Sequence, residues 1–178
     1  MIFFNMMQRI GKAIDQSTSV FTLRAAIGHA SILDLCMAPG GMLLYALQSN
    51  PGARATAFTL PVQNGGHAMM LSEDVRQRVS TKLCDITLLA ADMGVTVIPE
   101  DHPDRDGFIL EQQLMEAQVF DVVICDGQVL RLHTRARYRE VREARRMITT
   151  QLVLGLKHVK AGGRLSSDFP LASLRDTD

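Results

Sequence analysis

The chain reads Ser31-Ile-Leu-Asp-Leu-Cys-Met-Ala-Pro-Gly-Gly-Met-Leu-Leu-Tyr-Ala-Leu47 at the point where its first strand is expected. Apolar residues at 32, 33 and 35 predict a buried strand over 31–37, and a helix is expected from Met42. The small, bent turn between them places backbone N–H groups at a helix N-terminus, beside a ligand. Its two glycines would let that ligand approach closely. An ordinary βα turn fits the same residues, so this pattern alone leaves both interpretations open.

The rest of the chain alternates strand-like and helix-like segments. Further strands are expected at 54–60, 85–91 and 120–125 and from Arg164 onward, and helices at 3–16, 108–118 and 137–159. The polar stretch 73–82 is expected to form a surface helix or an insertion. This alternation predicts an α/β fold, a Rossmann-like parallel sheet with helices on both faces. Ligands of such sheets bind outside the carboxyl ends of the strands.

Composition and charge are those of a folded globular domain. The chain has 178 residues, no net formal charge and three scattered cysteines, without a Cys/His cluster that would hold a metal. The cysteines favour a reducing, intracellular setting, in the cytoplasm or nucleus. A faintly basic N-terminus leaves the mitochondrion open, and no apolar run is long enough to cross a membrane. We expect one domain, 1–178, in three parts: a helical segment 1–30, a Rossmann-like core 31–165 and an irregular tail 166–178.

Two stretches resemble the FtsJ-like methyltransferases, a family of S-adenosylmethionine-dependent RNA ribose 2′-O-methyltransferases. The first is Asp34-Leu-Cys-Met-Ala-Pro-Gly-Gly41, which is similar to the family's motif I. The second, Asp126-Gly-Gln-Val-Leu-Arg-Leu-His133, looks like fungal-type members. The resemblance implies that S-adenosylmethionine is the cofactor. It implies a set of cofactor-binding residues at the strand ends: Asp34, Ala38, Pro39, Gly40, Gly41, Asp92, Met93 and Asp126.

The second strand departs from the related pattern. Phe58 stands where many methyltransferases have an acid for the ribose hydroxyls, and Thr59 offers only a neutral hydrogen bond. Ribose contact is therefore expected from backbone groups and from the loop 63–67.

The resemblance also implies a catalytic Lys-Asp-Lys-Glu set. Asp126 fills the position of the Asp, and Lys12 is the candidate for the first Lys. Asp168 stands where the second Lys is expected, and the position of the Glu would lie beyond Asp178. The last strands of the family's sheet are thus expected to be missing or altered, as in a truncated or divergent C-terminus. A ribose hydroxyl needs a positioned base or a nearby cation, so the missing groups leave open a catalytically impaired module that still binds cofactor or RNA.

Arginines gather around the start of the last predicted helix. Four of them recur at 4, 3, 4 spacing and are expected on one face that tracks RNA phosphates: Arg135, Arg139, Arg142 and Arg146. The RNA would be ribosomal RNA, transfer RNA or an mRNA cap, while a merely solvated helix face fits the same spacing. The predicted fold would also suit a nicotinamide-dependent oxidoreductase, but this chain lacks the GxGxxG motif of such enzymes.

Overall fold

The computed structural model describes residues 2–23, 29–129 and 135–167. It contains a parallel five-stranded sheet in the order β3-β2-β1-β4-β5. The strands are β1 (Ser31–Asp34), β2 (Arg54–Thr59), β3 (Val79–Leu83), β4 (Phe120–Cys125) and β5 (Val159–Ser167). The α-helices are α1 (Ile2–Thr18), α2 (Gly41–Ser49), α3 (Glu73–Arg76) and α4 (Glu143–His158). Short 3₁₀ turns complete the fold: η1 (Val62–Asn64), η2 (Ile86–Leu88), η3 (Arg105–Gly107) and η4 (Arg137–Arg139).

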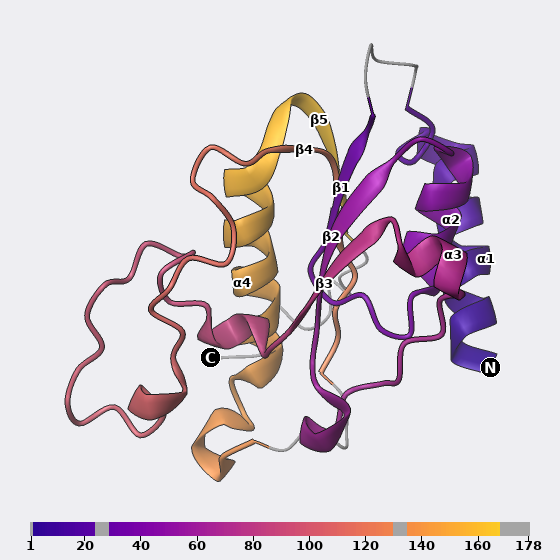
Figure 1. Ribbon diagram of the computed structural model, residues 1–178. Helices are drawn as coiled ribbons and strands as arrows, with labels where there is room; N and C mark the ends of the chain where they lie inside the picture. The colour runs from indigo at the N-terminus through magenta and orange to yellow at the C-terminus, as the bar shows by residue number, and fades with distance from the viewer. Residues whose placement is uncertain (1, 24–28, 130–134, 168–178) are drawn as a thin grey trace.

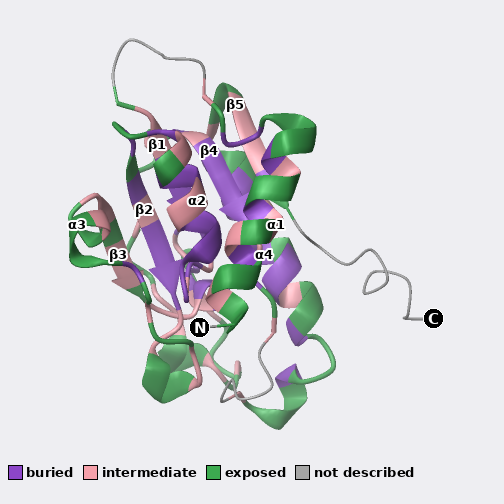
Figure 2. Cartoon of the chain, turned by 90° about the vertical axis from the view of Figure 1, so that its right-hand side faces the viewer, coloured by how far each residue is buried: buried purple, intermediate pink, exposed green. Residues whose placement is uncertain are grey.

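The helices cover both faces of the sheet, as the sequence predicted. In Figure 1, α1, α2 and α3 lie on one side of the strands, and α4 lies on the other with the long segment between β3 and β4. Alternate side chains of a strand point to opposite faces, so each central strand feeds two cores. Ile32 and Ile124 pack toward α1 and α2, whereas Leu33 and Val123 pack toward α4. Figure 2 shows these central strands as buried, inside helices with exposed outer faces. No helix in the described ranges is long and apolar enough to cross a membrane.

The third strand lies earlier in the chain than predicted. It runs over Val79–Leu83 and pairs with β2, whereas the expected strand 85–91 begins as a turn. Asp85 Oδ1 accepts hydrogen bonds from the backbone N and the hydroxyl of Thr87, at 2.9 and 2.7 Å, which bends the chain into η2. The strand that does form is at the edge of the sheet, where partly polar residues are tolerated. Its weak apolar alternation explains the wrong assignment.

The predicted helix 108–118 is absent from the described structure. Instead, the carboxylate of Asp92 accepts hydrogen bonds from the backbone N of Gln113 and of Leu114, with N–O distances of 2.8–3.1 Å. Leu114 is buried in the core on the α4 side. The periodic apolar residues of this segment therefore do not indicate a helix. The segment is held by the burial of Leu114 and by the hydrogen bonds to Asp92.

The last helix and strand also differ from the prediction. The expected helix 137–159 is divided into η4 and α4, and it ends at His158. His158 is fully buried, and its Nδ1 lies 2.7 Å from the carbonyl oxygen of Gln118. The fifth strand then starts at Val159, earlier than the expected Arg164, and it contains Gly162 and Gly163. Its last residues, 166–167, had been assigned to the irregular tail, while Asp168 and the rest of that tail lie outside the described residues.

Candidate cofactor site

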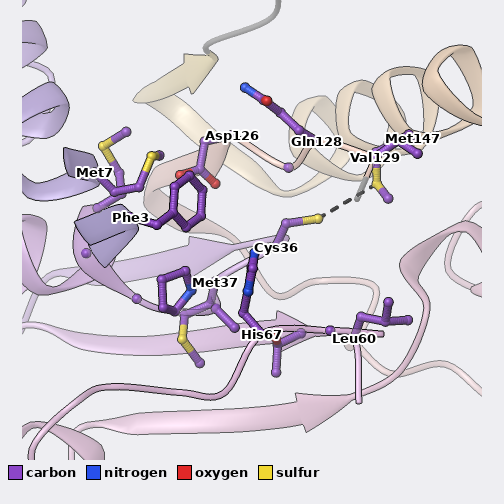
Figure 3. A pocket seen from close by; sticks show the side chains of 18 residues that line it. Phe3, Met7, Cys36, Met37, Leu60, His67, Asp126, Gln128, Val129 and Met147 are labelled. Carbon is purple, nitrogen blue, oxygen red and sulfur yellow. Dashed lines mark hydrogen bonds between the residues drawn. The ribbon is translucent and has the colours of Figure 1, made fainter. Parts of the chain in front are cut away.

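A cavity of about 220 Å³ lies at the carboxyl ends of β1, β2 and β4. The turn 36–42 forms its floor, and residues from the segments after β2 and β4 form two of its walls (Figure 3). Phe3 and Met7 reach it from α1, and Met147 reaches it from α4. Both helical layers of the fold therefore contribute to one site at the edge of the sheet.

The glycine turn after β1 has a shape that other residues could not take. Gly40 has a φ of 103°, in the left-handed region that favours glycine. A Cβ added at Gly41 would lie 2.2 Å from the carbonyl oxygen of Phe4, so this glycine lets α1 cross the start of α2 closely. The turn is also held from the side, because Met37 N donates to Phe58 O at 2.8 Å. The motif thus positions both the backbone floor of the cavity and the helix that forms one of its walls.

Two carboxylates lie close together at this edge of the sheet. Asp126 lines the cavity, and Asp34 is buried beneath the turn, with only 1% of its surface exposed. Asp34 Oδ1 accepts a hydrogen bond from Cys36 N at 3.1 Å, while its buried Oδ2 has no hydrogen-bond partner among the described residues. Burial, and then the negative charge of Asp126, raise the pKa of the Asp34 carboxyl well above its ordinary value. The site therefore favours a ligand that brings positive charge and hydrogen-bond donors.

Gln151, which the sequence analysis did not single out, holds the segment after β4 in place. Its side chain is fully buried on α4 and makes two hydrogen bonds with Gly127: Gly127 N donates to Oε1 at 2.8 Å, and Nε2 donates to Gly127 O at 3.0 Å. A Cβ on Gly127 would lie 2.2 Å from Cys36 Sγ, so the segments after β1 and β4 touch here. Cys36 Sγ lies 3.8 Å from Met147 Sδ in turn. Gln151 thus sets the position of the residue that follows Asp126.

Five of the expected cofactor-binding residues line the cavity: Ala38, Pro39, Gly40, Gly41 and Asp126. Thr59, Gly66 and His67 also line it, so the segment after β2 contributes as expected. The sequence analysis did not identify Phe3 and Met7 as cavity residues. Their helical spacing on α1 is equally typical of core residues, so it could not have distinguished the two roles.

Asp92, Met93 and Lys12 are not placed in this cavity. The carboxylate of Asp92 is used by the backbone of 113–114, and Met93 lines a different cavity. With the third strand at Val79–Leu83, the acid that follows its end is Asp85. Lys12 is exposed on α1 and is not among the residues that line the cavity with Asp126.

The four arginines expected on one solvent-facing helix surface are divided. Arg139 is buried and pairs with Glu143 at 2.7 Å and with Asp85 at 3.0 Å. Burial alone opposes its charge, but the pairing with these two carboxylates raises the pKa of Arg139 above its ordinary value. Of the other three, Arg135 precedes η4, and Arg142 and Arg146 lie at the start of α4. The spacing was wrong as a guide to exposure, because the first turns do not form one continuous α-helix.

The chain is similar to known methyltransferases. The model of the FtsJ-like methyltransferase family matches residues 12–169. No curated protein matches the chain. Among solved structures, an O-methyltransferase family protein from Burkholderia thailandensis is 20% identical, with a TM-score of 0.48, over 92% of this chain and 39% of that one. Coclaurine N-methyltransferase bound to N-methylheliamine and SAH is 19% identical, with a TM-score of 0.42, over 89% of this chain and 34% of its own.

The chain spans little more than a third of the length of these solved structures. Its family is therefore assigned from the match to the family model. Members of that family use S-adenosylmethionine, in agreement with the expected cofactor. The match spans most of the 178 residues and includes both the glycine turn and Asp126. The chain therefore belongs to the FtsJ-like methyltransferase family.

Proposed function

We propose that the chain binds S-adenosylmethionine in the cavity at the ends of β1, β2 and β4 and transfers its methyl group to the ribose 2′-oxygen of an RNA. The observation that carries the proposal is a pair of neighbouring carboxylates, the buried Asp34 and the cavity-lining Asp126, at a glycine turn that leaves room for a ligand. When bound, this cofactor supplies a methyl group on a positively charged sulfur and leaves as the neutral thioether S-adenosylhomocysteine.

The residues of the site suit such a ligand. Burial and then the charge of Asp126 raise the pKa of Asp34, and a cation bound at Asp126 offsets that charge. Phe3, Met7 and Met37 also line the cavity and supply apolar contact. The cavity would thus offer both a carboxylate for the charged groups of the cofactor and apolar side chains for its other parts.

The transfer itself requires a base at the cavity. Asp126 is the carboxylate in position to accept the proton of the attacking hydroxyl. The hydroxyl oxygen forms a bond to the methyl carbon while the carbon–sulfur bond breaks, with its electron pair remaining on sulfur. RNA as the acceptor is supported by the family and by the arginines at the start of α4. Three free cysteines support an intracellular location for this reaction.

A second candidate, a module that binds cofactor or RNA without catalysis, is favoured by one observation. Among the described residues that line the cavity there is no lysine or arginine. The cation that would lower the pKa of the 2′-hydroxyl is therefore not supplied by these residues.

Two measurements separate the candidates. Titration calorimetry with S-adenosylmethionine should show binding to the unaltered chain, with weaker binding by Gly40→Val and Asp126→Ala. Asp101→Ala removes an exposed acid and serves as the matched control. The absence of binding heat would refute both cofactor-dependent readings. Transfer of a labelled methyl group to ribosomal, transfer or capped RNA would then identify the enzyme, whereas binding without transfer would identify the module.

A further inference from the structure

A second cavity, of about 480 Å³, lies on the α4 side of the sheet. It is an open cavity lined by η4, the first turns of α4 and the segment after η2, which lie on the same side of the sheet in Figure 1. It shares no lining residue with the cofactor cavity. Its chemistry is therefore independent of the carboxylates Asp34 and Asp126.

Arginines line this second cavity along α4. Arg139 forms a fixed part of it, because Glu143 and Asp85 already pair with its guanidinium. Arg146 is about a quarter exposed, and its contacts are long: 3.8 Å to Asp104, 4.0 Å to Glu143 and 3.5 Å to the hydroxyl of Thr87. Arg142 is exposed at the entrance. The guanidinium groups nearest to solvent thus suit an anion such as a phosphate, which arginine binds through paired N–H donors.

Aromatic rings also line this cavity. Tyr138 is 48% exposed, and its hydroxyl donates a hydrogen bond to Asp104 Oδ2, which holds the ring in place. His102 and Phe108 pack edge to face, with ring centroids 5.1 Å apart. A fixed, half-exposed ring beside arginines is the arrangement with which proteins stack a nucleobase and hold its phosphate.

We propose that this cavity binds one phosphorylated nucleotide, with its base against Tyr138 and its phosphate at Arg142 and Arg146. The ligand is either a free nucleotide or one unit of an RNA chain, since both carry the same base and phosphate. Where RNA is the source, the cavity deepens the proposed function by providing a contact for the substrate outside the cofactor site.

The test is titration calorimetry of the full chain with the four nucleoside monophosphates, with inorganic phosphate and with a short single-stranded RNA. Nucleotide binding should weaken by about tenfold or more in Arg142→Gln, as expected for loss of one charge-assisted contact. Tyr138→Leu should weaken binding of nucleotides but not of phosphate. Arg9→Gln removes the same charge from an exposed position on α1 and should change nothing.

The outcomes are decisive in both directions. Tighter binding of the RNA than of the monophosphates assigns the site to an RNA chain, and the reverse assigns it to a free nucleotide. Absence of binding, equal losses in Arg9→Gln and Arg142→Gln, or displacement of the nucleotide by S-adenosylhomocysteine would overturn the proposal. Nucleotide binding by a chain that does not bind S-adenosylmethionine would refute the proposed function and leave this inference standing.

Discussion

Replacing Gln151 with leucine tests whether α4 positions the cofactor site. Gln151 makes two hydrogen bonds with the backbone of Gly127, at 2.8 and 3.0 Å, and both residues are buried. Leucine fills a similar volume but leaves the N–H and the C=O of Gly127 without these partners. Each buried polar group left unpaired costs about 1–3 kcal/mol, so the full penalty is about 2–6 kcal/mol.

The segment after β4 can escape part of this penalty by moving toward solvent. Such a movement would displace Asp126, which precedes Gly127 directly, from the wall of the cavity. We therefore expect Gln151→Leu to lower both the free energy of unfolding and the affinity for S-adenosylmethionine. For a chain of this length, the melting temperature should fall by about 2–4 °C for each kcal/mol lost.

Urea unfolding and calorimetry with S-adenosylmethionine measure the two effects. Gln48→Leu makes the same chemical change at an exposed position of α2 and is the matched control. If Gln151→Leu unfolds and binds the cofactor like Gln48→Leu, the argument that Gln151 positions the site is refuted.

Two further predictions concern buried charges. The pKa of Asp34 in the folded chain lies above its ordinary value of 3.8, because of burial and Asp126. The folded state therefore holds an extra proton between the two values and loses stability as the pH rises through the folded-state pKa. In urea unfolding of the cofactor-free chain, Asp34→Asn should reduce this loss and be the more stable protein at neutral pH; an unchanged pH slope would contradict this. Arg139→Met leaves the buried Glu143 and Asp85 without their shared guanidinium and should cost about 3–5 kcal/mol. The same unfolding assay should show partial recovery when Glu143→Met is added, and a loss below about 1 kcal/mol would count against the pairing.

Parts of the fold with strong local signals were predicted well. The strand Phe120–Cys125 was predicted with its observed bounds, because its apolar, β-branched residues are buried on both faces of the sheet. The turn around Gly40 and Gly41 was recognised from small residues whose geometry admits few alternatives. The turn also carried the resemblance to the family, and its residues 38–41 line the cavity.

The errors arose where a residue's role depends on a distant partner. Asp92 looked like a ligand contact at the end of a strand, but its carboxylate binds a backbone segment about twenty residues later. Arg139 looked exposed on a helical wheel, but Asp85 is more than fifty residues away in the chain and draws it into the interior. Neither partner is visible in local spacing.

The amino-acid order was sufficient for the α/β class, for the glycine turn and for the family, because each follows from short-range chemistry such as apolar periodicity and glycine's freedom at positive φ. Tertiary structure decided which acids reach the cavity, where the edge strand lies, and that Gln151 supports the site. Those features depend on hydrogen bonds and ion pairs between elements that are distant in the sequence. Polar groups need such partners once they are buried, and which groups become buried is decided only when the elements pack together.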